Sequence, residues 1–312
     1  MTDILGSYQN GNYTVTIYDD GTKVRQNEFD ALIPDTIESL DLKITGCCDM
    51  MCKMCHEDST PWGKHGDIMS PSFIDKLHPY TELAIGGGNP LSHPDLIPFL
   101  EKCQAHKLIP SMTVNQIHFE KDFEMIKYLV DRKLIWGLGI SLVDPTEDFI
   151  CKAKQFTNAV IHVIAGIVTA DQIIALSNND LKILILGYKD FRRGTKYLYA
   201  HPDDVVNGIN RMRVLLPIMV DHEYFKAISF DNLAIKQLEV RNLMTEDEWK
   251  LFYMGDDGEY TMYVDMVERK FALNSCAPLN RRYQLMDTIE EMFNHLKEEE
   301  NKWDSITEYI SG

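Results

Sequence analysis

The segment Gly46-Cys47-Cys48-Asp49-Met50-Met51-Cys52-Lys53-Met54-Cys55-His56 decides how the rest of the chain is interpreted. The chain has 312 residues and seven cysteines, and four of the cysteines fall within this short segment. Counted from Cys48, the spacing is Cys-x3-Cys-x2-Cys and ends at Cys55. Such crowding favours metal ligation over packing. Three thiolates on one short loop are able to hold three irons of a four-iron cluster and leave the fourth iron open.

A structural zinc site is the alternative interpretation of this segment, and it would need a fourth Cys or His at ligand spacing. His56 follows Cys55 directly and is awkwardly placed for that role. The remaining cysteines, Cys103, Cys151 and Cys276, are isolated, and the sequence has no second Cys-x2-Cys. We therefore expect no second cluster and mainly structural thiols, although Cys276 is also a candidate for substrate contact or hydrogen-atom donation.

Cys48, Cys52 and Cys55, placed just after the alternating run Ile37–Ile44, resemble the cluster loop of the radical S-adenosylmethionine (radical SAM) superfamily. In that family the loop follows the first barrel strand and holds a 4Fe-4S cluster. The open iron chelates the amino and carboxyl groups of S-adenosylmethionine. One electron then cleaves the sulfonium, and the resulting 5′-deoxyadenosyl radical abstracts hydrogen from a substrate. Met54 stands where the family usually has an aromatic residue.

The run Gly86-Gly87-Gly88-Asn89-Pro90 resembles the family's Gly-Gly-Glu-Pro motif, which follows the second strand and holds the methionyl amino group. The resemblance implies that Gly87, Gly88, Asn89 and Pro90 bind the cofactor, since glycine permits close approach of the backbone. Asn89 replaces the usual Glu, so the contact to an ammonium carries no negative charge. A strand-to-helix turn is the alternative, and a dinucleotide fingerprint is absent because the third glycine is missing.

Further candidate cofactor-binding residues lie at later strand ends: Asn115, Ser141, Gly166, Gly187 and Tyr188. The resemblance implies that the first two reach the ribose or carboxylate of S-adenosylmethionine and that the others lie against its adenine. Turn capping and ordinary strand-end geometry are the alternatives. Lys189, Arg192 and Arg193 form a basic cluster at the same edge, which is interpreted either as a substrate-neutralising group or as a solvated surface cluster.

Short apolar runs alternate with amphipathic segments from residue 37 to about residue 219, which predicts an α/β fold with a parallel sheet. Because the polar clusters fall at strand ends, we expect a partial (β/α)6 TIM-like barrel. We divide the chain into an N-terminal β-hairpin extension (1–34), the barrel (35–232) and a C-terminal α+β extension packed on it (233–312). The hairpin turns at Asp19-Asp20-Gly21. A late hairpin is expected from Gly258–Val264 and Lys270–Leu273.

Composition restricts the partners and the location of the protein. The formal net charge is −17, which argues against binding to nucleic acid, although a nucleotide-sized substrate remains possible. The sequence has neither a membrane-spanning apolar run nor a signal peptide, and we expect a protein of the reducing cytoplasm.

The resemblance thus implies an enzyme with a 4Fe-4S cluster, S-adenosylmethionine and an external flavodoxin- or ferredoxin-like one-electron reductant. A peptide or protein is one candidate substrate, and a nucleoside or small metabolite is the other. A non-catalytic iron–sulfur or zinc protein is the alternative of another class.

Overall fold

The computed structural model describes residues 2–28 and 31–311, with side chains up to residue 300. Its centre is a large sheet whose first strands are all parallel and follow one another in chain order. These strands are β4 (Ser39–Thr45), β5 (Glu82–Gly87), β6 (Ile109–Asn115), β7 (Gly137–Ser141), β8 (Ala159–Ile164), β9 (Lys182–Leu186) and β10 (Ala227–Phe230). The predicted α/β class with a parallel sheet is therefore confirmed.

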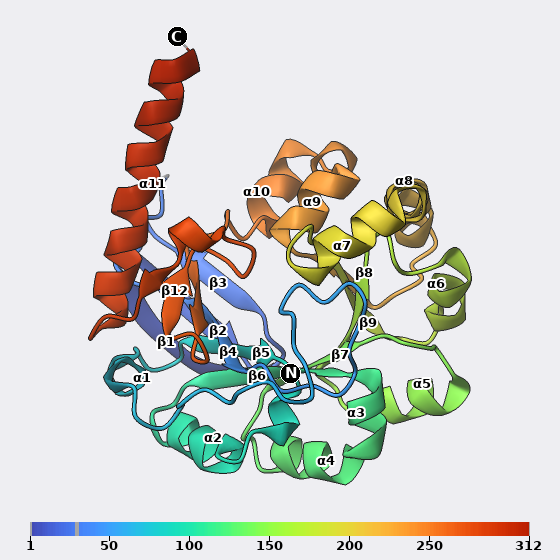
Figure 1. Cartoon of the computed structure of the whole chain (residues 1–312), viewed down its shortest axis with the longest axis horizontal. Coiled ribbons are helices and arrows are strands. Elements are labelled where there is room, and N and C mark those ends of the chain that lie inside the picture. The colour runs from blue at the N-terminus through green and yellow to red at the C-terminus, as the bar shows by residue number, and fades with distance from the viewer. Residues whose placement is uncertain (1, 29–30, 312) are drawn as a thin grey trace.

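Helices connect successive strands and lie around the outside of the sheet, with the strands inside (Figure 1). They are α1 (Ser72–Lys76), η1 (Pro90–Ser92), α2 (Leu96–Ala105), α3 (Gln116–Lys121), α4 (Phe123–Asp131), α5 (Glu147–Ala153), α6 (Ala170–Leu176), α7 (Arg193–Ala200), α8 (Pro202–Asp221) and α9 (Asn232–Leu238). Several begin at a side-chain cap, such as Thr146 of α5 and Thr169 of α6, whose hydroxyls accept backbone N–H bonds.

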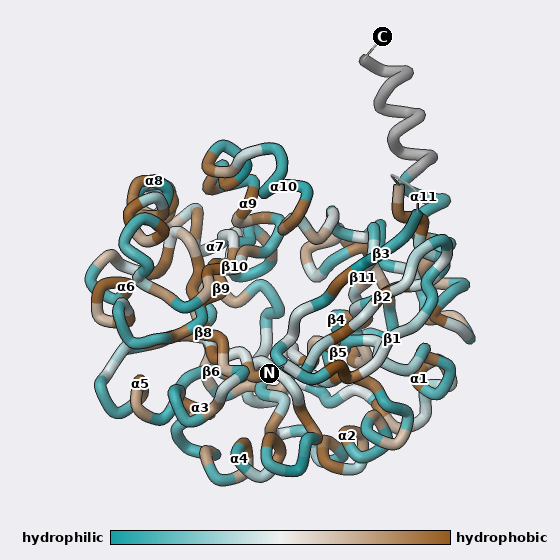
Figure 2. The backbone as a smooth tube through the Cα atoms, turned by 180° about the vertical axis from the view of Figure 1, so that it is seen from behind, coloured by the Kyte–Doolittle hydropathy of each residue, from teal (hydrophilic) through white to brown (hydrophobic). Residues whose placement is uncertain are grey.

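Alternation along β4 decides which side chains face the helices. Leu40, Leu42 and Ile44 are fully buried in the main hydrophobic core, while Asp41 and Lys43 point to the other face of the sheet. Figure 2 shows hydrophobic stretches along the strands in the middle of the molecule and hydrophilic stretches mainly in the outer loops. The inner face of the sheet is thus free to carry polar groups.

The C-terminal part continues this sheet. In the described residues the strand order is β10-β9-β8-β7-β6-β5-β4-β11-β12-β13, and β11 pairs with β4 in parallel. The elements are η2 (Val240–Leu243), α10 (Glu246–Phe252), β11 (Thr261–Asp265), β12 (Lys270–Ala272), η3 (Leu279–Arg281), β13 (Tyr283–Gln284) and α11 (Ile289–Ser311). The expected late hairpin is confirmed as the antiparallel pair β11–β12, but its addition to the edge of β4 was not expected.

The N-terminal segment forms a separate antiparallel sheet rather than a lone hairpin. Among the described residues its strands are β1 (Ile4–Asn10), β2 (Tyr13–Tyr18) and β3 (Lys23–Gln26), in that order. The predicted turn joins β2 to β3, whereas the additional strand β1 was missed. Tyr8, Tyr13, Val15 and Ile17 bury a small second core with Ile109 and Tyr260. No described helix combines the length and the apolar composition that a membrane span requires.

Candidate functional site

The cysteine segment lies in a long irregular loop between β4 and α1. Isolated bridges pair Thr45 with His65 and Cys47 with Thr60, so the two halves of the loop run side by side. The amide of Cys48 donates to the carbonyl of Thr60 at 2.8 Å. These bonds fix the start of the segment although it has no regular secondary structure.

Cys48, Cys52 and Cys55 are half-buried and free of disulfides. The amide of Cys55 donates to the carbonyl of Cys52 at 3.2 Å, which turns the chain between these two residues. Burial raises the pKa of Cys48 and of Cys52, and the charge of the neighbouring thiols raises each further. Neighbouring thiolates repel one another, and a bound metal cation would offset that repulsion by stabilising the thiolate form. The donor set therefore fits an iron–sulfur cluster.

A second arrangement around Cys48 was missed by sequence reasoning. Nε2 of His118 lies 2.5 Å from Oδ1 of Asp49, and the ligand atoms of Cys48, Asp49 and His118 all lie within 4.8 Å of one another. His118 is buried in α3, whereas Asp49 is exposed. This Cys–Asp–His trio could hold a single metal ion such as zinc. No local pattern joins positions 49 and 118, so the sequence gives no signal for it.

The three residues of the basic cluster have two different roles, one for Arg192 and Arg193 and another for Lys189. Nη2 of Arg193 donates to the carbonyl of Ser59 at 2.5 Å, and the same side chain forms an ion pair with Asp58. Nη1 of Arg192 donates to the carbonyl of Glu57 at 2.9 Å. Both arginines therefore hold the backbone of the cysteine loop from the start of α7.

Lys189 faces the inside of the sheet, where Nζ donates to Oγ of Ser275 at 3.1 Å. Its charge opposes the effect of burial on Asp41, whose pKa is raised to about 6 by burial. Asp41 is accessible to solvent, although the protein around it disfavours its charged form. Burial and the charge of Lys189 lower the pKa of His162 to about 4, so this imidazole is neutral at pH 7. The inner face thus carries the carboxyl group of Asp41, the neutral imidazole of His162 and the ammonium of Lys189. Of these three, only Lys189 was a candidate from the sequence.

The glycine run ends β5 against the cysteine loop. Gly87 has φ of +108°, and a Cβ there would lie 2.4 Å from the carbonyl oxygen of Thr45. A Cβ on Gly88 would lie 2.2 Å from the carbonyl oxygen of Cys47. By contrast, a Cβ on Gly86 would meet no atom within 4 Å. Gly87 and Gly88 therefore permit close approach of the backbone to the loop, while Gly86 borders open space.

The polar residues at the next strand ends serve as caps in the structure. Oδ1 of Asn89 accepts from the amide of Leu91 and begins η1, in which Pro90 is buried. Oδ1 of Asn115 accepts from the amide of Ile117 and begins α3. Ser141 pairs with Asn115 across β6 and β7, so these strand ends lie next to each other. Their roles toward a cofactor stay predictions.

The predicted adenine-side residues pack against covering helices. A Cβ on Gly166, where φ is +89°, would lie 3.0 Å from the carbonyl oxygen of Val205 in α8. The amide of Gly187 donates to Oδ1 of Asp231. Tyr188 is buried, and its hydroxyl donates to the carbonyl of Gly194 at 2.7 Å. These contacts explain the residue types on structural grounds, and their proximity to adenine stays a prediction.

The remaining cysteines differ in burial. Cys103 is fully buried in α2, as expected for a structural thiol, but Cys151 is exposed on α5. Cys276 is half-buried near Lys189, whose charge opposes the rise in the pKa of Cys276 that burial causes.

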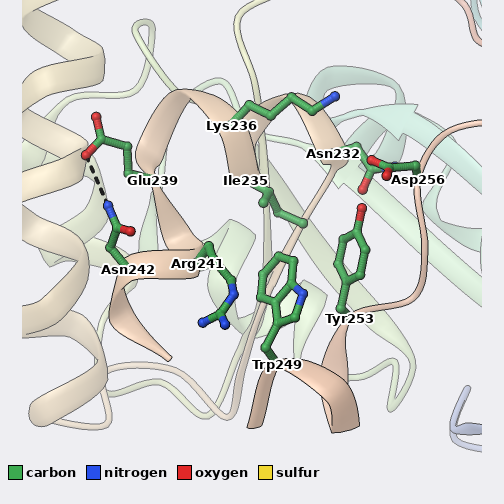
Figure 3. A pocket seen from close by; sticks show the side chains of 9 residues that line it. All are labelled: Asn232, Ile235, Lys236, Glu239, Arg241, Asn242, Trp249, Tyr253 and Asp256. Atoms are coloured by element: carbon green, nitrogen blue, oxygen red, sulfur yellow. Dashed lines mark hydrogen bonds between the residues drawn. The ribbon is translucent and has the colours of Figure 1, made fainter. Parts of the chain in front are cut away.

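A pocket of about 340 Å³ lies between α9 and α10, away from the cysteines. Figure 3 shows the side chains that line it, including Trp249, Tyr253 and Arg241. Trp249 stacks on Tyr253 with ring centroids 4.3 Å apart, and the guanidinium of Arg241 lies 5.2 Å from the Trp249 ring. None of the predicted site residues lines this pocket.

No protein-family model and no curated protein matches this chain. Crystal structures of SuiB from Streptococcus suis match its fold. SuiB bound to precursor peptide SuiA has a TM-score of 0.55 and 15% identity, over 83% of this chain and 65% of that chain. SuiB bound to S-adenosylmethionine has a TM-score of 0.53 and 12% identity, over 87% of this chain and 81% of that chain. The chain shares the SuiB fold.

Proposed function

We propose that this protein is a radical SAM enzyme that binds one 4Fe-4S cluster through Cys48, Cys52 and Cys55. The observation that carries the proposal is the set of three half-buried thiols on one loop, directly beside a glycine run that borders free space at Gly86. When bound, the cluster supplies the electron that cleaves S-adenosylmethionine to methionine and a 5′-deoxyadenosyl radical, which abstracts hydrogen from the substrate. The similarity in fold to SuiB bound to S-adenosylmethionine supports this proposal.

The chain's own residues contribute ligation, orientation and exclusion of water. Arg192 and Arg193 hold the loop that carries the cysteines, and Gly87 and Gly88 let the end of β5 contact it. Cofactor binding is assigned to Gly87, Gly88, Asn89 and Pro90, with Asn115, Ser141, Gly166, Gly187 and Tyr188 as further contacts. The surrounding partial barrel encloses the reacting atoms and orients the substrate's C–H bond.

The decisive experiment is anaerobic reconstitution with iron and sulfide, followed by a chemical reductant and S-adenosylmethionine. We expect release of 5′-deoxyadenosine and methionine by the wild-type protein and none by Cys52→Ser. A reconstituted protein that binds iron but releases neither product would contradict the proposed activity.

We propose a peptide or protein as the substrate. One of the similar structures is SuiB bound to a precursor peptide, and β1 forms an edge of the N-terminal sheet to which an extended peptide could add. A nucleoside or small metabolite is the alternative, since the inner face carries Asp41, His162 and Lys189. Deuterated candidates separate the two classes, because deuterium from the true substrate will appear in 5′-deoxyadenosine. An external flavodoxin- or ferredoxin-like protein is proposed as the reductant and the cytoplasm as the location.

A zinc-binding protein without catalysis is the second candidate, and the Cys48–Asp49–His118 trio favours it. Metal analysis of protein purified in air distinguishes the two. Stoichiometric zinc that is lost in His118→Ala, together with failure to form a cluster under anaerobic conditions, would support the zinc protein.

A further inference from the structure

A buried ionic cluster lies beneath the cysteine loop, on the inner side of β4. Nζ of Lys43 lies 2.8 Å from Oε2 of Glu57 and 3.1 Å from Oδ2 of Asp265. All three side chains are less than 10% exposed. Glu57 follows Cys55 by two residues, Lys43 belongs to β4, and Asp265 ends β11. One ammonium therefore joins the cysteine loop to the central strand and to the C-terminal hairpin.

Each carboxylate in this cluster has additional donors. The hydroxyl of Tyr263, also in β11, lies 3.2 Å from Oε1 of Glu57. Oδ1 of Asp265 accepts from the amides of Val267 and Glu268 at 2.9 Å each. Buried carboxylates with this many partners are held in one position, because moving either would leave a charge unpaired in a water-poor environment.

A second connection runs parallel to the first and does not use Lys43. Arg192 donates from Nη1 to the carbonyl of Glu57 and from Nη2 to Oε1 of Glu268, the latter at 3.1 Å. The turn between β11 and β12 is thus bonded to the cysteine loop through the guanidinium of Arg192, while Asp265, the last residue of β11, is connected to it through Lys43. The C-terminal hairpin contacts the loop from two directions.

We infer that Lys43, Glu57 and Asp265 are positioning residues for the iron–sulfur cluster, and that the β11–β12 hairpin is a part of the cluster site. This inference rests on the proposed function. Glu57 lies close in sequence to Cys55, so its fixed position restricts where that thiolate points. The ionic group formed by Lys43, Glu57 and Asp265 contains two carboxylates and one ammonium. Its excess negative charge disfavours the addition of an electron to a nearby iron–sulfur centre. Groups of this kind, which support metal ligands without touching the metal, commonly affect metal affinity.

Four variants test the inference in reconstituted full-length protein: Asp265→Asn, Lys43→Met, Lys43→Arg and, as a control, Asp148→Asn in an exposed ion pair of α5. Asp265→Asn keeps an oxygen for the amides of Val267 and Glu268 but removes a charge, so we expect the midpoint potential of the cluster to rise. Lys43→Met leaves two buried carboxylates unpaired, and we expect iron retention during gel filtration to fall about tenfold. Lys43→Arg retains the charge and restores retention, and the control matches wild type.

The outcomes separate this inference from the proposed function. If wild type forms the cluster and cleaves S-adenosylmethionine while Asp265→Asn keeps the wild-type potential and Lys43→Met keeps the wild-type iron content, the positioning role is wrong and the function stands. If wild type forms no cluster, both are wrong. Circular dichroism of each variant checks the fold. Should Lys43→Met fail to fold, Glu57→Gln takes its place, and an unchanged potential in that variant also contradicts the inference.

Discussion

The two ends of β4 both carry buried charges, but they are organised differently. At the amino end, Glu38 is fully buried and accepts hydrogen bonds from the hydroxyl of Tyr13 at 2.7 Å and from the guanidinium of Arg25, and it forms an ion pair with Lys23 at 3.1 Å. All three donors belong to the N-terminal sheet. At the carboxyl end, Lys43 of β4 pairs with Glu57 of the cysteine loop and with Asp265 of the C-terminal hairpin, so the charges come from three different segments.

The surroundings of the two ends explain what each contributes. The amino end is covered by the aromatic side chains of Tyr8, Tyr13 and Tyr260, and the guanidinium of Arg25 lies 3.7 Å from the centre of the Tyr260 ring. The carboxyl end has half-buried thiols and the free space at Gly86. In barrels of parallel strands, chemistry is carried out at the carboxyl end and the amino end contributes stability. We assign the two ends of this sheet in the same way.

The largest expected effect is loss of the cluster at the carboxyl end. Cys52→Ser replaces a thiolate ligand with a hydroxyl, which binds iron far more weakly, so iron content and 5′-deoxyadenosine release are expected to fall to background. The midpoint of urea unfolding in the apo protein should remain unchanged, because the side chain is only half-buried. Cys151→Ser, on the exposed side of α5, is the matched control. Full activity in Cys52→Ser would contradict the assignment.

At the amino end we expect a large effect on stability alone. Glu38→Ala leaves Lys23 and Arg25 without their buried partner and should reduce the free energy of unfolding by roughly 3–5 kcal/mol. Iron loading of the folded variant should match wild type. Asp75→Ala, which breaks the exposed pair with Lys102, should cost at most about 1 kcal/mol. If Glu38→Ala abolished loading without loss of stability, the division between the two ends would be wrong.

Two neighbouring glycines provide a finer test within the carboxyl end. Gly88→Ala places a methyl group against the carbonyl oxygen of Cys47 and should disturb cluster loading. Gly86→Ala projects into free space, so it should preserve loading and thermal stability. If S-adenosylmethionine occupies that space, its affinity for the loaded enzyme should fall about tenfold in Gly86→Ala, a loss of roughly 1.4 kcal/mol. Equal affinity in Gly86→Ala and wild type, measured by equilibrium dialysis, would place the cofactor elsewhere.

The smallest expected effect is a pH dependence at the amino end. Burial alone would raise the pKa of Glu38, but the hydrogen bond from Arg25 and the charge of Lys23 lower it below its ordinary value. A carboxyl group with a lowered pKa in the folded state stabilises the protein fully above the unfolded pKa of about 4.3, and this contribution is lost as the pH falls through the folded value. Urea unfolding between pH 3 and 7 should therefore show the advantage of wild type over Glu38→Gln shrinking only at the acidic end.

Local patterns predicted the strands and the cysteine loop well. Ala159–Ile164, for example, contains two Val and two Ile residues, and such β-branched side chains favour a strand without help from distant residues. The spacing of the three cysteines likewise lies within a few residues, so the sequence alone suggested a cluster.

What could not be predicted depends on residues that are distant in sequence. β11 pairs with β4 although all the other strands of the parallel sheet lie between them in the sequence. The register of this pair brings Asp265 opposite Lys43. Pairing of this kind is decided by which edge remains open after folding, and no short pattern records it. The contact between Asp49 and His118 also joins residues that are distant in sequence, and so do the contacts of Arg192 with the cysteine loop.

The central claim is that three thiolates leave one iron open for S-adenosylmethionine. The most direct measurement is electron–nuclear double resonance of the reduced, reconstituted protein with S-adenosylmethionine labelled with 15N at its amino group. We expect a hyperfine coupling between the label and the cluster that disappears when unlabelled cofactor replaces it. A cluster that shows no such coupling, because a fourth protein ligand occupies the remaining iron, would contradict the proposed open iron site.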